Sequence, residues 1–560
     1  MRKQSSTIEH ARAGGHIISV ASDNVSLNLA DLPKVRITPQ LPPPPERFIG
    51  REAELAKLED ALYPGRVVTL HGPGGIGKSA LAAAALWRLQ DGGALQQRFP
   101  EGVIFHTFYN RPQAAQALEQ IAVSYGEENL QPSVQDAARR ALAGRQALLI
   151  LDGAEEADDL RAVLAVRGGC GVLITSRSLR DVVERRLPIG PLPLAQAVSL
   201  LQAWAGEAAP GERDARAICQ LVGRLPLAVR LAGHYLANWG KPVDKYLESL
   251  RKSPLDALDR GDRREESVPL LVQQSLERVG EEARRIFAVL GRLALAPAGL
   301  AALAAGTGRE EEAAGYSLEE LVNYGLVRPH AGAYELAHAL LHTYARERLR
   351  VPPVALERLA THYTTLVEQA WRQGPEGYAT LEEARPHVMA LLPHLEKAAL
   401  WPPILDLAWA IQLYLDVRGY SAERVAVCRA ALDAARALEQ RDDESAWLNT
   451  LGLAYAGLGR VAEAIAYHEQ ALAIRREIGD RLGEGIDLFN LGIAYEGLNR
   501  VEKARNHYKQ ALAIFEAIKS PHAQAARAAL EELRPSKSMI GRLRERVGVT
   551  LFGLRGEEEE

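Results

Sequence analysis

A glycine-rich segment followed by a lysine and a serine is the strongest chemical signal in the sequence. Residues 72–79 read Gly-Pro-Gly-Gly-Ile-Gly-Lys-Ser, the G-x-x-x-x-G-K-S pattern of a phosphate-binding loop. The glycines let backbone N–H groups close around phosphate oxygens, and the start of a helix adds positive potential there. Lys78 would neutralise the β- and γ-phosphates of ATP, and Ser79 would bind Mg²⁺. The residues expected to hold the nucleotide here are Gly72, Gly74, Gly75, Ile76, Gly77, Lys78, Ser79 and Ala80.

Two further apolar segments end in polar side chains that could complete this site. Asp152 follows four consecutive leucine or isoleucine residues, and its carboxylate could hold Mg²⁺ together with Ser79. Glu155 could polarise a water molecule, although an acidic turn in solvent is an equally good reading. Arg177 follows a second apolar run and could sense a γ-phosphate through paired hydrogen bonds, or could form a surface ion pair. The catalytic candidates are therefore Lys78, Asp152, Glu155 and Arg177.

These residues can form one site only if the ends of several strands lie side by side. The sequence of residues 47–190 predicts such a fold. Helical and strand-like segments alternate along this part of the chain, which predicts a parallel sheet covered on both faces. The predicted strands are 66–70, 102–108, 147–151 and 171–175, and the predicted helices are 53–62, 79–89, 113–125, 136–142 and 160–166.

The segment from residue 191 to residue 350 has an almost entirely helical pattern. Short apolar runs at 325–327 and 334–336 are the exception, and they could form a small hairpin wing. The predicted helices are 194–205, 213–223, 226–238, 267–279, 281–294 and 338–349.

An internal repeat occupies the C-terminal part. Leu451-Gly452-Leu453-Ala454-Tyr455 returns as residues 491–495, and residues 470–474 return at the same interval as 510–514, with a weaker copy before them. Small residues stand where two helices must approach closely, and large residues fill the spaces between. We therefore expect helical hairpins over 401–535 that stack into a solenoid with a concave surface.

The composition limits the number of domains and the classes of protein to which the chain could belong. A chain of 560 residues with 47% apolar and 25% charged residues should form three to four globular domains. Its net charge of −4 gives no basic excess for nucleic acid, and it has no apolar run long enough to cross a membrane. The start of the sequence lacks the apolar core of a signal peptide, and the three cysteines lack metal or disulfide spacing, so we expect a cytoplasmic protein.

The two ends of the chain differ from the rest. Residues 16–22 and 25–29 alternate apolar and polar side chains around the turn dipeptide Asp23-Asn24, which predicts a hairpin or β-arch ahead of a proline-rich linker. A disordered tail is the alternative. Residues 536–560 are expected to form a cap helix and an acidic tail.

Three further motifs reveal a resemblance. Phe48–Leu55 resembles the motif at the start of STAND-class signalling ATPases of the NB-ARC type, and 223–228 (Gly-Arg-Leu-Pro-Leu-Ala) resembles their G-L-P-L-A motif. Residues 336–341 (Leu-Ala-His-Ala-Leu-Leu) resemble their M-H-D motif, and the repeats resemble tetratricopeptide units. The likeness covers residues 47–535 in the family's order.

The resemblance implies a multidomain architecture of an α/β P-loop NTPase domain, an all-α helical domain, a winged-helix domain and an α-solenoid. The expected modules are an N-terminal arm (1–46), the nucleotide-binding domain (47–190), a helical domain (191–262), a winged helix (263–350), a helical connector (351–400), the repeats (401–535) and the C-terminal cap and tail (536–560).

The resemblance also implies roles for residues outside the phosphate loop. Ile49, Gly50 and Arg51 would border the adenine and ribose. Pro226, with Leu227 beside it, would pack on the adenine.

Carried over in the same way, His338 would touch the β-phosphate of ADP; without the resemblance it would be an ordinary helix histidine. Two departures from the family pattern, Ala339 for the acid of M-H-D and Gly153 for a second acid after Asp152, imply a slow switch rather than a metabolic ATPase.

The expected function is an ATP/ADP-controlled switch. The repeats would bind a protein or peptide on their concave face, and the ATP-bound form would assemble into an oligomer that activates an effector, as in prokaryotic defence or programmed cell death. Because little of the chain remains for an output domain, the effector would act in trans, reached through residues 15–29. The alternatives are a constitutive repeat scaffold with a structural nucleotide site, and a DNA-binding regulator that uses residues 267–350.

Overall fold

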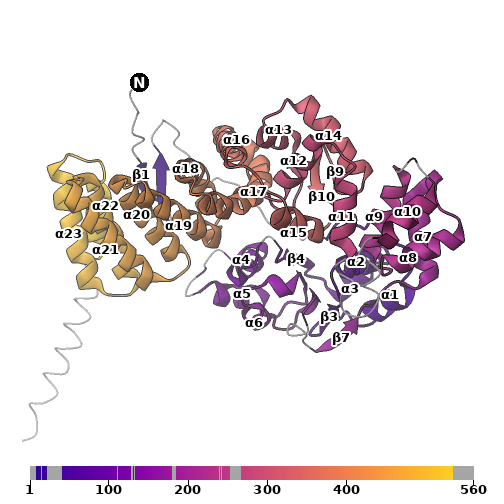
Figure 1. Ribbon diagram of the computed structural model, residues 1–560. Helices are drawn as coiled ribbons and strands as arrows, with labels where there is room; N and C mark the ends of the chain where they lie inside the picture. Colours follow the sequence, from indigo (N-terminus) through magenta and orange to yellow (C-terminus); the bar gives the residue numbers. More distant parts are fainter. Residues whose placement is uncertain are drawn as a thin grey trace, which may run out of the picture. The chain divides into compact units, whose positions relative to one another are not determined.

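The computed structural model describes residues 8–13, 16–21, 41–109, 111–127, 130, 133–178, 184–238, 240, 242–252 and 267–533. The chain divides into two compact units, residues 33–434 and residues 435–560 together with 1–32 (Figure 1). Each unit is described on its own.

The sheet that carries the phosphate loop has five strands, all parallel, in the order β4-β5-β6-β3-β7. Its strands are β3 (Val67–His71), β4 (Val103–Thr107), β5 (Leu148–Asp152), β6 (Gly171–Ser176) and β7 (Arg185–Pro188). Every residue of β5 and β6 is buried, as the prediction of helices on both faces requires. The helices are α1 (Glu52–Glu59), α2 (Lys78–Asp91), α3 (Ala94–Arg98), α4 (Ala114–Ser124), α5 (Val134–Leu142) and α6 (Leu160–Leu164).

Strand β7 is the one strand of this sheet that the sequence pattern did not predict. Its two arginines, Arg185 and Arg186, are exposed, and the strand pairs only with β3. An edge strand with charged side chains has no apolar alternation, because little of it faces a core.

A helical region and a small mixed region follow within the same unit. The helical region contains α7 (Leu194–Ala205), α8 (Glu212–Leu221), α9 (Pro226–Ala237) and α10 (Val243–Lys252). The mixed region runs α11 (Ser267–Leu276), α12 (Glu281–Leu290), β8 (Ala298–Gly299), α13 (Leu300–Thr307), α14 (Glu311–Asn323), β9 (Val327–His330), β10 (Ala333–Leu336) and α15 (Ala339–Arg348). Strands β9 and β10 form the predicted hairpin, and β8 extends it to an antiparallel sheet in the order β8-β10-β9.

Long helices form most of residues 353–532. The connector consists of α16 (Pro353–Arg372) and α17 (Tyr378–Lys397), and the repeats of α18 (Trp401–Val417), α19 (Ser421–Ala437), α20 (Arg441–Gly457), α21 (Val461–Ile478), α22 (Arg481–Gly497), α23 (Val501–Ala517) and the closing helix α24 (Ala523–Glu532). The helices from α18 to α23 begin at equal intervals along the chain, so the helix pairs follow the predicted period, the weaker first copy included.

The small residues of the repeat lie where their helices touch. A Cβ atom added to Gly452 of α20 would lie 2.7 Å from the ring of His468 on α21, and one on Gly492 of α22 would collide with Tyr508 on α23. Large buried side chains, Tyr508 and Phe515 among them, fill the space around these close approaches. The repeat is therefore a set of stacked helical hairpins, as predicted.

The N-terminal segment forms an antiparallel hairpin of β1 (Ile8–Ala13) and β2 (His16–Ala21). The predicted strand over 16–22 is present as β2, and it pairs with the segment before it. The predicted turn at 23–24, the second segment 25–29 and the tail 536–560 lie outside the described residues. Among the described helices, none is both long and apolar enough to cross a membrane.

Candidate nucleotide site

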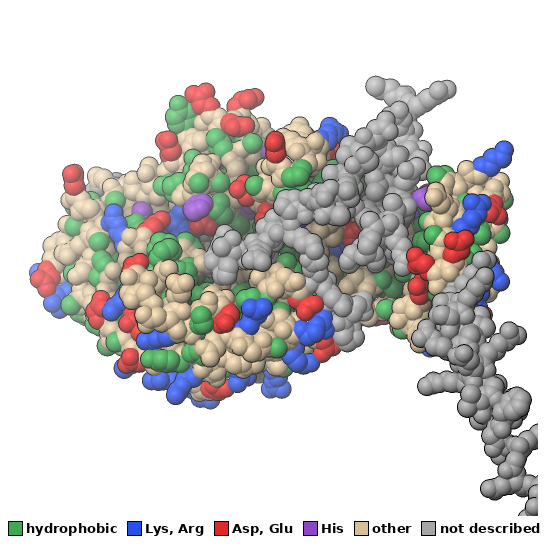
Figure 2. Space-filling model, turned by 180° about the vertical axis from the view of Figure 1, so that it is seen from behind, with side chains coloured by type: hydrophobic (Ala, Val, Ile, Leu, Met, Phe, Trp, Pro, Cys, Tyr) green, Lys and Arg blue, Asp and Glu red, His purple; other side chains and the backbone are tan. Residues whose placement is uncertain are grey.

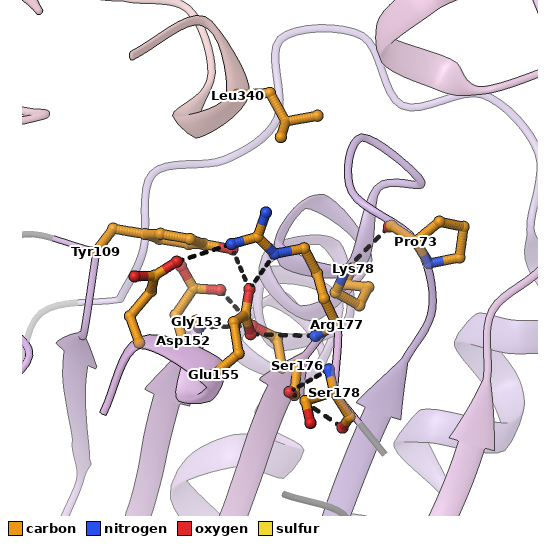
Figure 3. A network of polar contacts seen from close by, with 12 residues as sticks. Pro73, Lys78, Tyr109, Asp152, Gly153, Glu155, Ser176, Arg177, Ser178 and Leu340 are labelled. Carbon is orange, nitrogen blue, oxygen red and sulfur yellow. Dashed lines mark hydrogen bonds and ion pairs between the residues drawn. The ribbon is translucent and has the colours of Figure 1, made fainter. Parts of the chain in front are cut away.

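The phosphate loop lies between the end of β3 and the start of α2. Gly75 and Gly77 have φ values of 72° and 91°, a left-handed region that favours glycine. Lys78 is buried, and its Nζ donates to the carbonyl oxygens of Gly72 (2.8 Å) and Pro73 (3.0 Å), as Figure 3 shows for Pro73. The lysine therefore lies across the loop, in the place from which it could reach a phosphate.

The two predicted Mg²⁺ ligands are in direct contact. Ser79 Oγ donates to Asp152 Oδ1 at 2.6 Å, and Thr175 Oγ1 donates to the same oxygen at 2.6 Å. Burial raises the pKa of Asp152, against the lowering effect of these two hydroxyls. A hydroxyl and a carboxylate at the phosphate loop are the donors that Mg²⁺ takes with a nucleotide, so the site fits the ion. Bound there, Mg²⁺ would neutralise phosphate charge.

Glu155 and Arg177 bind each other. Arg177 Nε donates to Glu155 Oε1 at 2.5 Å and its backbone N donates to Oε2 at 3.1 Å, while the hydroxyl of Tyr109 donates to Oε1 at 3.2 Å (Figure 3). Burial raises the pKa of Glu155, but the hydrogen bonds outweigh it and the net shift is downward. Arg177 was predicted either to sense a γ-phosphate or to form an ion pair, and the structure shows the ion pair. That Arg177 senses a γ-phosphate stays a prediction. That Glu155 polarises a water molecule also stays a prediction.

Tyr109 is a site residue that the sequence analysis missed. It follows β4, and a Cβ atom added to Gly153 would lie 2.7 Å from its ring. Gly153 also has a φ of 71°. Both the left-handed backbone and the tyrosine ring therefore disfavour any side chain at the position after Asp152, an acidic one included. An aromatic residue just beyond the end of a strand was the available signal.

Arg51 lies against the phosphate loop. Its guanidinium donates through Nη2 to the carbonyls of Ile76 and Gly190, both at 2.9 Å, and its side chain is 2% exposed. The backbone N of Arg51 donates to Gln196 Oε1 at 3.3 Å, and a side chain at Gly50 would collide with Gln196. Arg51 thus ties the loop to the start of the helical region, while its predicted place beside adenine and ribose stays a prediction.

Two other modules touch the same loop. The backbone N of Leu227, at the start of α9, donates to the carbonyl of Gly75 at 3.3 Å, and Pro226 lies against Gly77. A Cβ atom added to Gly75 would lie 3.2 Å from Leu227 Cβ and 3.4 Å from Leu340 Cδ1 in α15. The G-L-P-L-A-like segment and the start of α15 therefore both cover the loop.

His338 lies at the start of α15 and caps it. Its Nδ1 accepts from the backbone N of Leu340 at 3.0 Å, which requires an unprotonated Nδ1. Burial, and after it a ring of positive charges, lowers the pKa of His338 to about 3. Those charges belong to Arg230, Lys78, Arg328 and Arg177. A neutral imidazole among four cations suits an anionic ligand such as a phosphate.

The remaining predicted residues lie beside these contacts. Ile49 and Ala80 are half-buried next to Gly50 and Ser79, and Gly72 and Gly74 are buried in the loop. The structure thus gathers the predicted residues from five other segments around the loop 72–80, namely 49–51, 152–155, 177, 226–227 and 338.

Comparisons with known proteins agree with this site. Residues 47–187 match the AAA ATPase domain family, and residues 442–517 match the tetratricopeptide repeat family. The regulatory protein AfsR of Streptomyces griseus is 28% identical over 375 residues, which is 62% of this chain and 38% of AfsR. Its Streptomyces coelicolor counterpart is 28% identical over 333 residues, 55% of this chain and 33% of the relative. The chain thus spans only 33–38% of the length of these two relatives.

Solved structures show weaker likeness. A STAND protein with a tetratricopeptide repeat sensor from Pyrococcus horikoshii aligns over 92% of this chain and 91% of its own, at 16% identity and a TM-score of 0.38. A Walker-type ATPase of Pyrococcus abyssi aligns over 55% of this chain and 99% of its own, at 15% identity and a TM-score of 0.28. The two family matches, in their order along the chain, agree with the ATPase domain and the repeats that the motifs indicated: residues 47–187 form an AAA-type ATPase domain, and tetratricopeptide repeats follow it in the C-terminal part.

Proposed function

We propose that the chain is an ATP/ADP-controlled signalling switch that senses a protein or peptide through its repeats, oligomerises when ATP-bound and activates an effector, with prokaryotic defence or cell death as its setting. The observation that carries the proposal is that residues from three modules contact the same phosphate loop. Arg51 of the nucleotide domain, Leu227 of the helical region and Leu340 of α15 all contact it.

A nucleotide bound at such a loop can control how modules pack. A ligand shifts an equilibrium only by its differential contacts with the two states. Arg177 and His338 offer those contacts, since one is expected to meet a γ-phosphate and the other the β-phosphate of ADP. The AfsR relatives are regulatory proteins, which agrees with a regulatory role here.

The partners are part of this proposal. The concave face of the repeats would receive the sensed protein or peptide, and residues 15–29 would recruit the effector in trans.

Light scattering after size exclusion tests the switch. The purified chain is measured in ADP, in ATP and in a non-hydrolysable ATP analogue, each with Mg²⁺, beside Lys78→Ala as the control without a working site. We expect a small species in ADP, a larger one in both ATP conditions, and no change in the variant. One size in all three nucleotides would instead favour a constitutive repeat scaffold.

The DNA-binding alternative meets an electrostatic objection. We interpret the helix and strand order of 267–348 as a winged helix, in which α14 would be the helix presented to DNA. This helix carries Glu311, Glu312, Glu319 and Glu320 and has no lysine or arginine. Acidic and basic side chains are also intermingled over the face that Figure 2 shows. We therefore propose an internal packing role, and salt-dependent binding to duplex DNA in fluorescence anisotropy would contradict it.

A further inference from the structure

The nucleotide domain contacts the first repeat through a buried glutamate. Glu119 lies on α4 and is 3% exposed. Its Oε1 accepts from the backbone N of Ser421 at 2.6 Å, and its Oε2 accepts from the backbone N of Ala422 at 3.2 Å. These N–H groups open helix α19, so a carboxylate 302 residues away in sequence caps the second helix of the first repeat. All three residues belong to one compact unit.

The start of α19 is also tied to the connector. Arg385 of α17 donates through Nη1 to both carboxylate oxygens of Glu423, at 2.6 and 2.8 Å, and both side chains are buried. Glu382, one turn earlier on α17, accepts from the hydroxyls of Tyr414 (2.7 Å) and Tyr420 (3.0 Å). The first repeat therefore has a firm ionic attachment to the connector. Glu119 adds hydrogen bonds from the nucleotide domain, and Arg111 of that domain lies near enough to Glu423 and Arg385 to interact with their charges.

Helix α4 is in turn tied to the strand that leads to the nucleotide site. Gln120, next to Glu119, pairs with His106 Nδ1 at 2.8 Å and donates to the carbonyl of Phe105 at 3.0 Å. Both residues lie on β4, which ends just before Tyr109, and Tyr109 binds Glu155. Hydrogen bonds and chain neighbours thus link α19 through α4 and β4 to the Glu155–Arg177 pair.

We infer that the contact of Glu119 with the first turn of α19 is a resting latch, by which the first repeat holds α4, β4 and Tyr109 in the geometry that keeps the nucleotide site closed. The inference rests on the proposed switch function and names its regulation. Ligand binding by the repeats would open the latch by moving α19.

Burial opposes the charged form of Glu119 at this contact. Burial raises the pKa of Glu119 to about 8, against the lowering effect of its backbone hydrogen bonds. Returning this carboxyl to water therefore recovers hydration free energy, which offsets part of the lost hydrogen bonding. Because the cost of burying the carboxyl opposes the gain from its hydrogen bonds, a small movement of the repeats could break the contact between Glu119 and α19.

Two substitutions on opposite sides of the contact test the latch in the full-length protein. Glu119→Ala removes both acceptors. Ser421→Pro removes the backbone N–H and the hydroxyl that Ser421 offers to Glu119, at the first helical position, where proline is tolerated. Glu127→Ala is the matched control, because Glu127 pairs with Arg140 (3.3 Å) at the surface and surface ion pairs contribute little. The assay is stopped-flow release of a fluorescent ADP analogue, with light scattering in ATP.

We expect each latch variant to release the ADP analogue about tenfold faster than wild type, which is about 1.4 kcal/mol. The double variant should add nothing, because both changes break one contact. Release at the wild-type and Glu127→Ala rate from folded Glu119→Ala and Ser421→Pro would overturn the latch, even if ATP still enlarges the protein. If Glu119→Ala does not fold, as judged by circular dichroism, Ser421→Pro decides. A wild-type protein of unchanging size refutes the switch proposal, and the release rates still judge the latch.

Discussion

Arg51 offers the sharpest test of how the phosphate loop is held, through the change Arg51→Met. Methionine keeps much of the buried apolar stem and removes the guanidinium, with its two 2.9 Å bonds to Ile76 and Gly190. A hydrogen bond from a charged donor contributes about 1.5–3 kcal/mol, and a buried carbonyl left without a partner costs about 1–3 kcal/mol.

Part of that contribution is offset in the wild-type protein. Burial lowers the pKa of Arg51, which shows that holding the charged guanidinium there is unfavourable, although Glu54 raises it. Lys78 and Leu227 also still hold the loop in the variant. We therefore expect a net loss of about 1.4–2.8 kcal/mol in binding, a ten- to hundredfold weaker affinity for ADP.

Isothermal titration calorimetry with two ligands, ADP and pyrophosphate, measures this loss and locates it. If Arg51 acts by holding the loop, both ligands weaken by a similar factor, because both bind the loop. The matched control is Arg88→Met, since Arg88 makes only half-exposed ion pairs with Glu52 (2.9 Å) and Glu59 (3.0 Å) on the same domain.

Two results would refute this reasoning in different ways. Wild-type affinity of Arg51→Met for ADP would show that the loop does not depend on the guanidinium. Weaker ADP binding with unchanged pyrophosphate binding would show that Arg51 acts on the adenine or ribose, as the family resemblance implies.

Three further predictions concern neighbouring residues. Asp152→Asn should abolish the strengthening of ATP binding by Mg²⁺, measured by titration with Mg²⁺ and with chelator; an undiminished Mg²⁺ effect would contradict its role as a ligand. Gly153→Ala should lower the free energy of unfolding by about 1–3 kcal/mol, because Gly153 has a left-handed backbone and lies against the Tyr109 ring. In denaturation experiments, the double variant Gly153→Ala/Tyr109→Ala should recover the part of this loss that the ring causes. The pKa of His338, about 3, lies below its unfolded value of 6.5, so its stabilising effect is full above about pH 6.5 and is lost as pH falls toward 3. His338→Asn keeps a capping acceptor without titrating, so the melting temperature of wild type relative to this variant should fall between pH 6.5 and pH 4; a constant difference would argue against a neutral cap.

The sequence predicted those parts of the site whose structure depends on residues close together in the chain. The phosphate loop, Asp152 and Arg177 each depend on a few consecutive residues at a strand end, and the predicted strands lie within one or two residues of β3 to β6. The repeats were predictable for a related reason, since a helix pair of fixed length imposes the same spacing on every copy.

Contacts between distant segments were not predictable in this way. Nothing near Arg51 indicates that its guanidinium reaches the carbonyl of Gly190, and nothing near Glu119 indicates a partner 302 residues later. Alternation likewise identified a strand over residues 16–22 but gave no sign of its pairing with residues 8–13. The ion pair of Glu155 with Arg177 likewise joins two strand ends whose neighbour relation depends on sheet order.

The equal spacing of the repeat helices has an evolutionary meaning. Helix α20 begins at Arg441 and helix α22 at Arg481, with the same side chain at the same place in the pair. A deletion or duplication of one whole helix pair there would rejoin the chain at an equivalent position, with every later helix still facing its neighbour as before. The array can therefore gain or lose whole helix pairs by recombination in a lineage, while the nucleotide domain over residues 47–187 is left unchanged.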